Sequence, residues 1–346
     1  MKAELVFPQS DVWATLLTET SHDVFHTPGY TTVLANHEGG LPRAFLASDG
    51  YSTLLIPIIL RPIPEQGGDL LDAISPYGYP GPLLHHRKDG SDGFLSRAIS
   101  ELPRVLQQHR VVSLFMRCHP LMSIRLDPFD SVGSIVRHGE TVYMDLTQSN
   151  DQIWRQIRSG HRNEINRAKR NGQSVSIDHD HYRLGEFMDI YMETMDRLGA
   201  STYYRFAPEF FNGLIAELGE QLAIAFVELD GVPIAAGMFT ECCGTVQYFL
   251  SGARAEYQKQ QPTKLMLYEM AMWAKARNNH TLHLGGGLGG AKDSLFAFKS
   301  GFAKTTRPFY TWRLIAMQNE YDYLVRRRGL DISKSDYFPA YRQPIK

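Results

Sequence analysis

Alternating and continuous apolar segments predict two β-hairpins, one in each half of the chain. The first covers residues 44–60 and the second residues 222–240, and each has an Asp-Gly pair between its apolar runs. This pair favours a tight turn, because glycine accepts the positive φ angles that such turns need. The same patterns predict further strands at 111–116, 141–145, 174–178 and 281–284.

Apolar positions that recur every three to four residues predict three helices in the second half. One follows Ala207-Pro208 and another, from 263 to 277, follows Pro262, since proline is favoured at the first helical position. A third is predicted from 149 to 172, with a capping box at its start and Asn-Gly at its end. Its buried face is predicted to contain Ile153, Ile157, His161 and Ile165.

The order of these elements is repeated along the chain. In both halves a helix-like stretch precedes the hairpin, and a segment that contains tyrosine and glycine follows it, at 74–79 and at 246–252. A length of 346 residues is also more than one typical core requires. We therefore expect an α/β protein of two domains, 1–147 and 148–346, each a mixed sheet flanked by helices.

Composition excludes several classes of protein. The net charge is −1, so a nucleic-acid partner would need a local basic patch. No apolar run is long enough to span a membrane. Three cysteines cannot build a disulfide framework, which favours a cytoplasmic location, and no Cys or His pair has the spacing of a metal site.

The segment 282–302 contains the most informative pattern. A short strand leads into five glycines within six positions, including Gly285, Gly286 and Gly287, and a helix follows with Asp293 or Ser294 as its cap. Backbone N–H groups in such a loop can bind an anion or a developing oxyanion. A flexible surface loop is the alternative, but the position between a strand and a capped helix favours a functional role. Neither a P-loop nor a dinucleotide site fits this spacing.

Lys299 follows the glycine-rich loop on this helix, between Phe298 and Phe302. Two interpretations remain open. The lysine extends along apolar neighbours to reach solvent, as on many amphipathic helices, or it is held in place to bind an anionic group.

The segment 155–170 is strongly basic, with six Arg or Lys side chains against Glu164 alone. Arg162 and Arg167 belong to this set. A charge run is usually a solvated helix face, yet such an excess also suits the phosphates of a nucleotide-linked substrate or of RNA. The sequence does not decide between these two interpretations.

Two aromatic turns are weaker candidates for substrate binding. Tyr77 and Tyr79 lie among glycines and prolines, and Tyr204 and Arg205 follow a polar stretch. Each pair can line a cleft or simply pack a turn. A serine hydrolase is not indicated, because no Gly-x-Ser-x-Gly motif is present.

Three segments together resemble the FemAB/FemX family, a branch of the GNAT acyltransferase superfamily. They are Arg162 to Gly172, the strand and turn from Tyr248 to Gly252, and Leu282 to Phe302 with its Asp-Ser-Leu-Phe-x-Phe-Lys-x-x-Phe element. The tyrosine-glycine turn at 77–81 also matches. The resemblance extends over most of the chain and is strongest from about 147 to 313.

This resemblance implies two tandem GNAT-like domains and transfer of an amino acid from aminoacyl-tRNA to an amine. The acceptor would be a peptidoglycan precursor or a small molecule, and no cofactor would be needed. The family lysine maps to Lys299, which would stabilise charge in the transition state, and the family's basic helix maps to Arg162 and Arg167. Asp293 is the nearest carboxylate, either as a general base or only as the helix cap.

Two departures from the family pattern keep other functions open. The chain lacks the long coiled-coil insertion of some members. It also lacks the loop that binds the pyrophosphate of CoA in GNAT enzymes, and Pro262 removes a donor there. The latter favours aminoacyl-tRNA over acetyl-CoA or another acyl-CoA. The alternatives are an acyl-CoA-dependent N-acyltransferase and a non-catalytic binding module.

Overall fold

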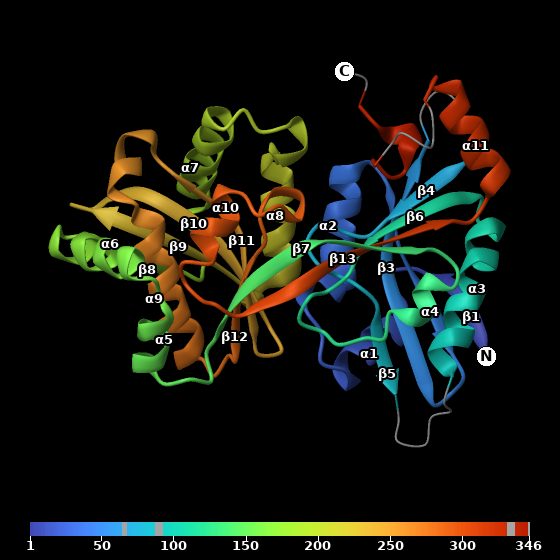
Figure 1. Ribbon diagram of the computed structural model, residues 1–346, viewed down its shortest axis with the longest axis horizontal. Helices are drawn as coiled ribbons and strands as arrows, with labels where there is room; N and C mark the ends of the chain where they lie inside the picture. Colours follow the sequence, from blue (N-terminus) through green and yellow to red (C-terminus); the bar gives the residue numbers. More distant parts are fainter. Residues whose placement is uncertain (64–67, 87–92, 331–335, 345–346) are drawn as a thin grey trace. The chain divides into compact units, whose positions relative to one another are not determined.

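A computed structural model describes residues 1–63, 68–86, 93–330 and 336–344. The chain forms two compact units, one of residues 1–137 with 310–346 and the other of residues 138–309 (Figure 1). The predicted division at residue 147 differs from this arrangement, because the segment from Tyr310 onward belongs to the first unit. Among the described residues, no helix has the length and apolar character needed to cross a membrane.

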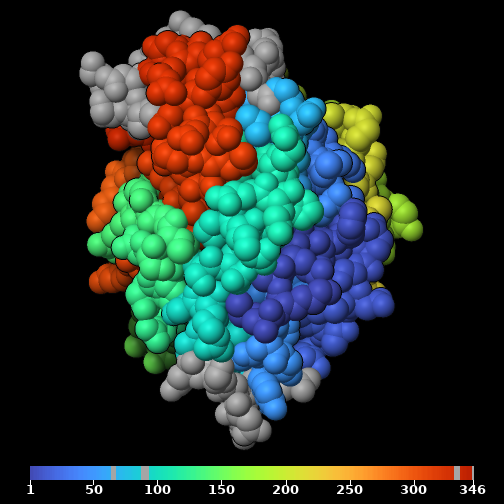
Figure 2. Space-filling view, turned by 90° about the vertical axis from the view of Figure 1, so that its right-hand side faces the viewer, coloured from blue at the N-terminus to red at the C-terminus, as the bar shows by residue number. Residues whose placement is uncertain are grey.

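Strand pairing and packing explain why the C-terminal segment belongs to the first unit. Strand β13 (Thr306–Ile315) pairs antiparallel with β6 (Val111–Arg117). Helix α11 (Gln318–Arg327) then buries Tyr321 and Leu324 against Ile63. Figure 2 shows this segment in red beside surface segments in blue and teal from the first 137 residues. A local sequence pattern does not reveal such a long-range return of the chain.

The first unit contains a mixed sheet with the strand order β1-β2-β3-β4-β6-β13, and β5 also pairs with β3. Only β4 and β6 are parallel among these pairs. The remaining strands are β1 (Lys2–Val6), β2 (Leu41–Ser48), β3 (Ser52–Pro62), β4 (Leu71–Ile74) and β5 (Leu83–His86).

Alternation along β2 distributes its side chains between two cores of the first unit. Phe45 and Ala47 pack with helix α3 (Phe94–Gln108), whereas Ala44 and Leu46 pack with α1 (Asp11–Glu19). Successive strand residues point to opposite faces, so both faces of the sheet are covered. Helix α2 (Pro28–Glu38) contacts β2 and β3, and α4 (Asp127–Asp130) packs on α3.

The second unit contains a mixed sheet with the order β7-β12-β11-β10-β9-β8. Only β11 and β12 are parallel. The strands are β7 (Ser134–Asp145), β8 (Ser174–Asp178), β9 (Leu222–Leu229), β10 (Val232–Cys242), β11 (Thr245–Ala253) and β12 (Thr281–Gly285). Asp230 and Gly231 have φ angles of 53° and 77°, which confirms the tight turn of the predicted second hairpin.

Helices surround this second sheet. Helix α9 (Pro262–Ala276) buries its apolar side chains against the strands together with α5 (Asn150–Gln156) and α6 (Ser159–Arg170). Helix α7 (Leu184–Arg197) contacts β10 and β11, and α8 (Pro208–Leu218) contacts β9. The short helix α10 (Ser294–Lys299) follows the glycine-rich loop.

The single helix predicted over 149–172 is wrong in one respect. Ile157 and Arg158 have extended ψ angles of 129° and 141°, and they separate α5 from α6. The amide of Arg158 donates 2.8 Å to the carbonyl of Gly301 instead of continuing a helix. The periodic apolar positions hid this break, because Ile153, Ile157 and Ile165 all point into one core.

Candidate active site

The candidate site of the second unit begins where the two parallel strands part. Pairing between β11 and β12 ends at Gln247 and His283, whose buried side chains are joined by a hydrogen bond of 2.7 Å. Beyond this point Tyr248 pairs with β10, and Gly285 pairs with β7. The carboxyl ends of parallel strands are a recurrent place for ligand sites, since side chains and loops from both strands converge there.

Lys299 is directed at this position from α10. Its side chain is buried, its Nζ donates to the Gly286 carbonyl at 2.8 Å, and it lies 5.9 Å from the centre of the Tyr248 ring. The interpretation that this lysine reaches solvent is therefore wrong. Among the described residues, Nζ donates a hydrogen bond to the Gly286 carbonyl. An ammonium has three hydrogens, so others remain to donate to a substrate.

Burial has a second consequence for Lys299. Removing an ammonium from water disfavours its charged form and lowers the pKa to about 8, although the nearby carboxylate of Asp293 acts in the opposite direction. A lysine with this pKa is mostly protonated at neutral pH. It can therefore present a positive charge to a developing oxyanion in a place with little competing water.

The glycine-rich loop is packed at its two ends, where Gly285, Gly286 and Gly290 are buried, whereas Leu288 and Gly289 are exposed. Gly285 has a φ of 76°, which favours glycine. A Cβ at Gly286 would lie 2.9 Å from the carbonyl oxygen of Glu140, and a Cβ at Gly287 would lie 2.1 Å from that of Ala291. The missing side chains thus allow the loop to pass close to neighbouring backbone and to bring the Gly286 carbonyl to Lys299.

Asp293 connects this loop to α10. Its Oδ1 accepts the amide of Phe296 at 2.8 Å, and its Oδ2 accepts the amide of Leu288 at 2.9 Å. These bonds hold the pKa of Asp293 below its usual value, because they stabilise the charged form. The prediction of a helix cap at Asp293 is confirmed. A role as proton acceptor stays a prediction, and the lowered pKa disfavours it.

Replacing Asp293 by alanine is expected to lower the free energy of unfolding by about 1 kcal/mol, the usual cost of losing an N-cap. Asp293→Asn is the matched control, because asparagine caps helices nearly as well. Urea denaturation of the two variants checks this. Equal stability of the alanine variant and the wild type would contradict the capping role.

Tyr248 on β11 also borders the site, with its ring centre 5.9 Å from the Lys299 Nζ. Its hydroxyl hydrogen-bonds with Ser251, and burial raises the pKa of the phenol to about 12. The phenol therefore stays protonated and neutral at physiological pH. The family resemblance includes Tyr248 as a predicted substrate-binding residue, whereas Ser251 and the Gln247–His283 pair were not predicted, although polar side chains within apolar strands are a usable signal.

Basic residues gather where α6 packs on α9. Arg162 is half-buried and donates to the carbonyl of Arg155, whereas the exposed Arg167 forms an ion pair with Glu164 and donates to the carbonyl of Lys259. Partial burial lowers the pKa of Lys264, and the charges of Arg158 and Arg167 act in the same direction. We call this surface the basic face. It consists of Arg158, Arg162, Arg167, Lys259 and Lys264.

The other predicted binding residues have different surroundings. The carbonyl of Tyr204 accepts the hydroxyl of Tyr191 on α7 at 2.8 Å, and Arg205 forms an ion pair with Asp196 on the same helix. These contacts stabilise the turn after α7. A role of Tyr204 and Arg205 in substrate binding stays a prediction.

Tyr77 and Tyr79 lie in the first unit. The carbonyl of Tyr77 accepts the hydroxyl of Tyr30 at 2.8 Å, and the ring of Tyr79 meets Phe25 edge to face. The guanidinium of Arg117 lies 5.9 Å from the Tyr77 ring. The two tyrosines thus belong to a packed turn, and their role in binding also stays a prediction.

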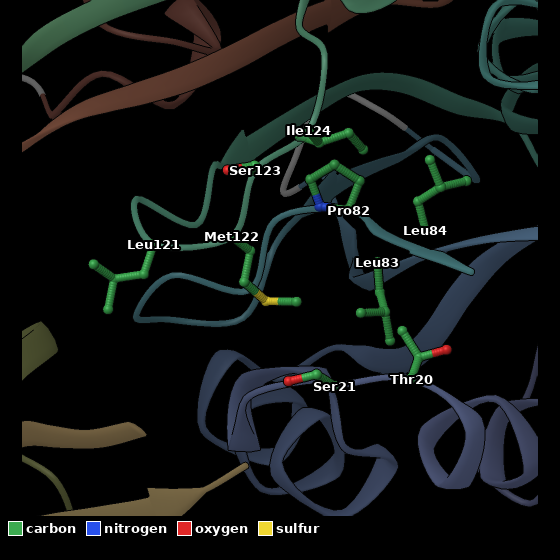
Figure 3. A pocket seen from close by; sticks show the side chains of 9 residues that line it. All are labelled: Thr20, Ser21, Pro82, Leu83, Leu84, Leu121, Met122, Ser123 and Ile124. Carbon is green, nitrogen blue, oxygen red and sulfur yellow. The ribbon is translucent and has the colours of Figure 1, made fainter. Parts of the chain in front are cut away.

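A hollow of about 290 Å³ follows this turn in the first unit. Figure 3 shows Met122 and Leu121 on one side and Leu83 and Thr20 on another. No charged side chain of the described residues lines it, so it offers no chemistry comparable to that around Lys299. The full set of lining residues is Thr20, Ser21, Pro82, Leu83, Leu84, Leu121, Met122, Ser123 and Ile124.

Comparison with known proteins relates part of the chain to a family of domains and most of the chain to solved structures of similar fold. Residues 155–299 match the family model described as an acetyltransferase (GNAT) domain. No curated protein matches the chain. The matched segment begins on α5 and ends at Lys299, and it identifies an acyltransferase domain.

Solved structures extend the likeness to most of the chain. The crystal structure of FemX has a TM-score of 0.69 at 13% identity, over 93% of this chain and 99% of that one. L-PGS from Bacillus licheniformis has a TM-score of 0.57 at 15% identity, over 89% and 92%. The C-terminal domain of a putative lysylphosphatidylglycerol synthetase from Agrobacterium fabrum has 0.57 at 12%, over 91% and 95%. The predicted GNAT-like α/β fold is confirmed.

Proposed function

We propose that this GNAT acyltransferase with a FemX-like fold transfers an amino acid from aminoacyl-tRNA to the amine of a small molecule or peptidoglycan precursor, forming an amide. The observation that carries the proposal is the buried ammonium of Lys299, which donates one hydrogen bond to Gly286 and has others to offer. The FemAB/FemX resemblance assigns its lysine to this position, and the neighbouring structures of FemX and L-PGS support a shared fold.

The proposed reaction is a direct transfer without a covalent enzyme intermediate. The neutral amine of the acceptor attacks the ester carbonyl at the 3′ end of the tRNA, the bond between the carbonyl carbon and the ester oxygen breaks, and this oxygen leaves as a ribose hydroxyl that takes up the proton lost by the amine. Lys299 stabilises the oxyanion that forms on the carbonyl oxygen, as preorganised donors do in acyl transfer. The amides of Gly285 and Gly287 are proposed as further donors, because the loop lies beside the ammonium.

The basic face supports a donor that carries phosphates. It lies on α6 and around the start of α9, and α6 meets α10 through the Arg158–Gly301 backbone hydrogen bond. The phosphates of a tRNA acceptor end would be neutralised there while the ester approaches Lys299. No metal or cofactor takes part in this scheme.

A CoA thioester is the second candidate donor, and the description of the matched domain as an acetyltransferase favours it. The loop before α9 argues against it. The amides of Gln261 and Lys264 donate to the carbonyls of Gln258 and Gln261, and Pro262 has no amide hydrogen. Few backbone donors therefore remain there for a pyrophosphate.

Replacing Arg162 and Arg167 together by glutamine is expected to weaken binding of the phosphate-bearing donor. The slope of log K against log salt should also become shallower, by roughly 0.7–0.9 for each phosphate that the protein no longer neutralises. Titration of the donor at several salt concentrations measures both effects.

The matched control for this pair is the double change of Arg326 and Arg327 on α11. Both are exposed and belong to the first unit, so the charge removed is the same and the place differs. An equal loss of binding in both double variants would indicate a general charge effect and would contradict a specific basic face.

Donor discrimination tests the proposed function directly. The protein is incubated with charged tRNA or with acetyl-CoA, each with a mixture of amine acceptors, and label is followed from the donor. Transfer that RNase abolishes supports the aminoacyl-tRNA reaction. Transfer from acetyl-CoA alone supports the N-acyltransferase, and capture of a protein partner without any transfer supports a binding module.

A further inference from the structure

His161 on α6 packs against the end of α10, the helix that carries Lys299. Its side chain is buried, and its ring centre lies 5.6 Å from that of Phe298 and 4.9 Å from that of Phe302. Gly301 leaves room for the ring, because a Cβ there would lie 2.3 Å from Nε2. The packing thus fits an imidazole closely into the end of α10.

Hydrogen bonds define which nitrogen of His161 carries the proton. Nε2 lies 2.9 Å from the carbonyl oxygen of Phe298, and Nδ1 lies 3.4 Å from a guanidinium nitrogen of Arg158. A guanidinium only donates and a carbonyl only accepts. The neutral ring therefore accepts at Nδ1 and donates from Nε2 to Phe298, the residue just before Lys299.

Burial keeps this ring neutral. It lowers the pKa of His161 to about 4, and the positive charges of Lys264 on α9 and Arg158 on α6 act in the same direction. Glu164 on α6 and the carbonyl of Phe298 on α10 act against them. At physiological pH the ring is thus a fixed neutral donor to α10.

Helix α10 needs such an anchor because it is short. It has 6 residues, so few of its own hydrogen bonds hold it. His161 and the amide of Arg158 attach the chain around its end, at Phe298 and Gly301, to α6. The start of α10 is attached by Asp293, which leaves Lys299 between two fixed ends.

We propose that His161 is a positioning residue, which holds α10 so that the Lys299 ammonium stays beside the Gly286 carbonyl and the reacting ester. The inference rests on the proposed function for its effect on catalysis. It follows from the attachment of a carbonyl adjacent to Lys299 and from the steep dependence of acyl transfer on placement of the donor. His161 itself would not touch the substrate.

Two substitutions of nearly equal size separate hydrogen bonding from packing. His161→Gln keeps an amide donor that can reach Phe298, whereas His161→Met has a similar length and no donor. The methionine variant is expected to show a kcat lower by about tenfold or more with little change in KM, because ground-state binding is intact. The glutamine variant should recover most of this decrease. Methionine and glutamine variants with the wild-type kcat would overturn the proposal.

Amide hydrogen exchange of residues 296–302 gives a readout that needs no substrate. Faster exchange there in His161→Met, with the rest of the second unit unchanged and His161→Gln close to wild type, is expected. Unchanged exchange would overturn the positioning role whether or not tRNA is the donor. Absence of transfer activity in the wild type would instead contradict the proposed function.

A second perturbation covers the case in which the methionine variant does not fold. Gly301→Ala keeps the histidine at position 161 but pushes its ring away from Phe298, because the added Cβ would occupy the position of the imidazole edge. The same decrease in kcat and the same faster exchange are expected. A folded Gly301→Ala protein with wild-type kcat and exchange would overturn the proposal.

Discussion

Replacing Lys299 by methionine is expected to lower kcat by roughly 10²–10³-fold, the usual effect of removing one oxyanion donor. Methionine keeps most of the buried volume and removes the charge, so folding should be retained. The ammonium is buried and bonded to the Gly286 carbonyl, and a surface lysine elsewhere cannot replace it. Steady-state transfer with charged tRNA measures the effect.

The pH dependence of the wild type provides a second measurement of Lys299. Its pKa is lowered to about 8, so the proposed oxyanion stabilisation is expected below pH 8 and should be lost as the pH rises through this value. The methionine variant should lack this decrease. A free amine acceptor titrates in the opposite direction, so the ratio of wild-type to variant rates isolates the contribution of Lys299.

Lys304→Met is the matched control. This lysine is exposed and lies close to α10 in the sequence, so the chemical change is the same and the surroundings are solvent. It should retain the wild-type kcat. A folded Lys299→Met protein with normal turnover would remove Lys299 from the mechanism and would leave the glycine-rich loop as the sole source of donors.

Local signals in the sequence were sufficient to predict most elements of the second unit. Asp230-Gly231 defined the second hairpin, Pro208 and Pro262 defined the starts of α8 and α9, and Asp293 capped α10 as expected. Each of these signals acts within a few residues. The turns, helix starts and caps that these signals specify therefore depend little on the rest of the fold.

The burial of Lys299 could not be predicted in this way. Its neighbours Phe298 and Phe302 suit a lysine on an amphipathic helix as well as one in a pocket. What decides is the position of Lys299 next to the glycine-rich loop and to Tyr248 on β11, which brings the Gly286 carbonyl and the Tyr248 ring to the ammonium. The contact with Tyr248 joins residues about 50 positions apart and the contact with Gly286 joins residues 13 positions apart, and neither leaves a local pattern in the sequence.

The same limit applies to the basic segment. Its excess of positive charge is evident in the sequence, but the ion pair of Lys169 with Glu269 on α9 is not. Arg167 is also partly neutralised by Glu164. These ion pairs lower the net positive charge of the segment. The proposed site for a phosphate-bearing donor is therefore the basic face, on the side of α6 that lies next to the start of α9.

Acidification is expected to destabilise the first unit through His26. This side chain is fully buried, and its Nδ1 accepts the amide of Asp23 at 3.1 Å. Burial lowers its pKa from 6.5 to about 3, with a smaller contribution from His119. Between these values the unfolded chain binds a proton that the folded chain does not, so stability falls as the pH decreases.

The free energy of unfolding is expected to fall by about 1.4 kcal/mol for each pH unit below 6.5. Above that pH, His26 no longer makes the stability depend on pH. His161 acts in the same sense in the second unit, because burial lowers its pKa to about 4. At pH 4.5 each histidine is therefore expected to lower the free energy of unfolding by about 3 kcal/mol relative to neutral pH.

His26→Gln tests this contribution in the first unit. Glutamine at the third position of a capping box keeps an acceptor for the Asp23 amide and does not titrate. Urea denaturation from pH 7 to pH 4.5 should give the variant a shallower loss of stability by about 1.4 kcal/mol per pH unit, at a small cost at pH 7. His109→Gln, on an exposed position of the same unit, should keep the wild-type slope. An unchanged slope in His26→Gln would mean that acid unfolding of this unit has another cause, such as protonation of its buried carboxylates, because the imidazole can no longer contribute.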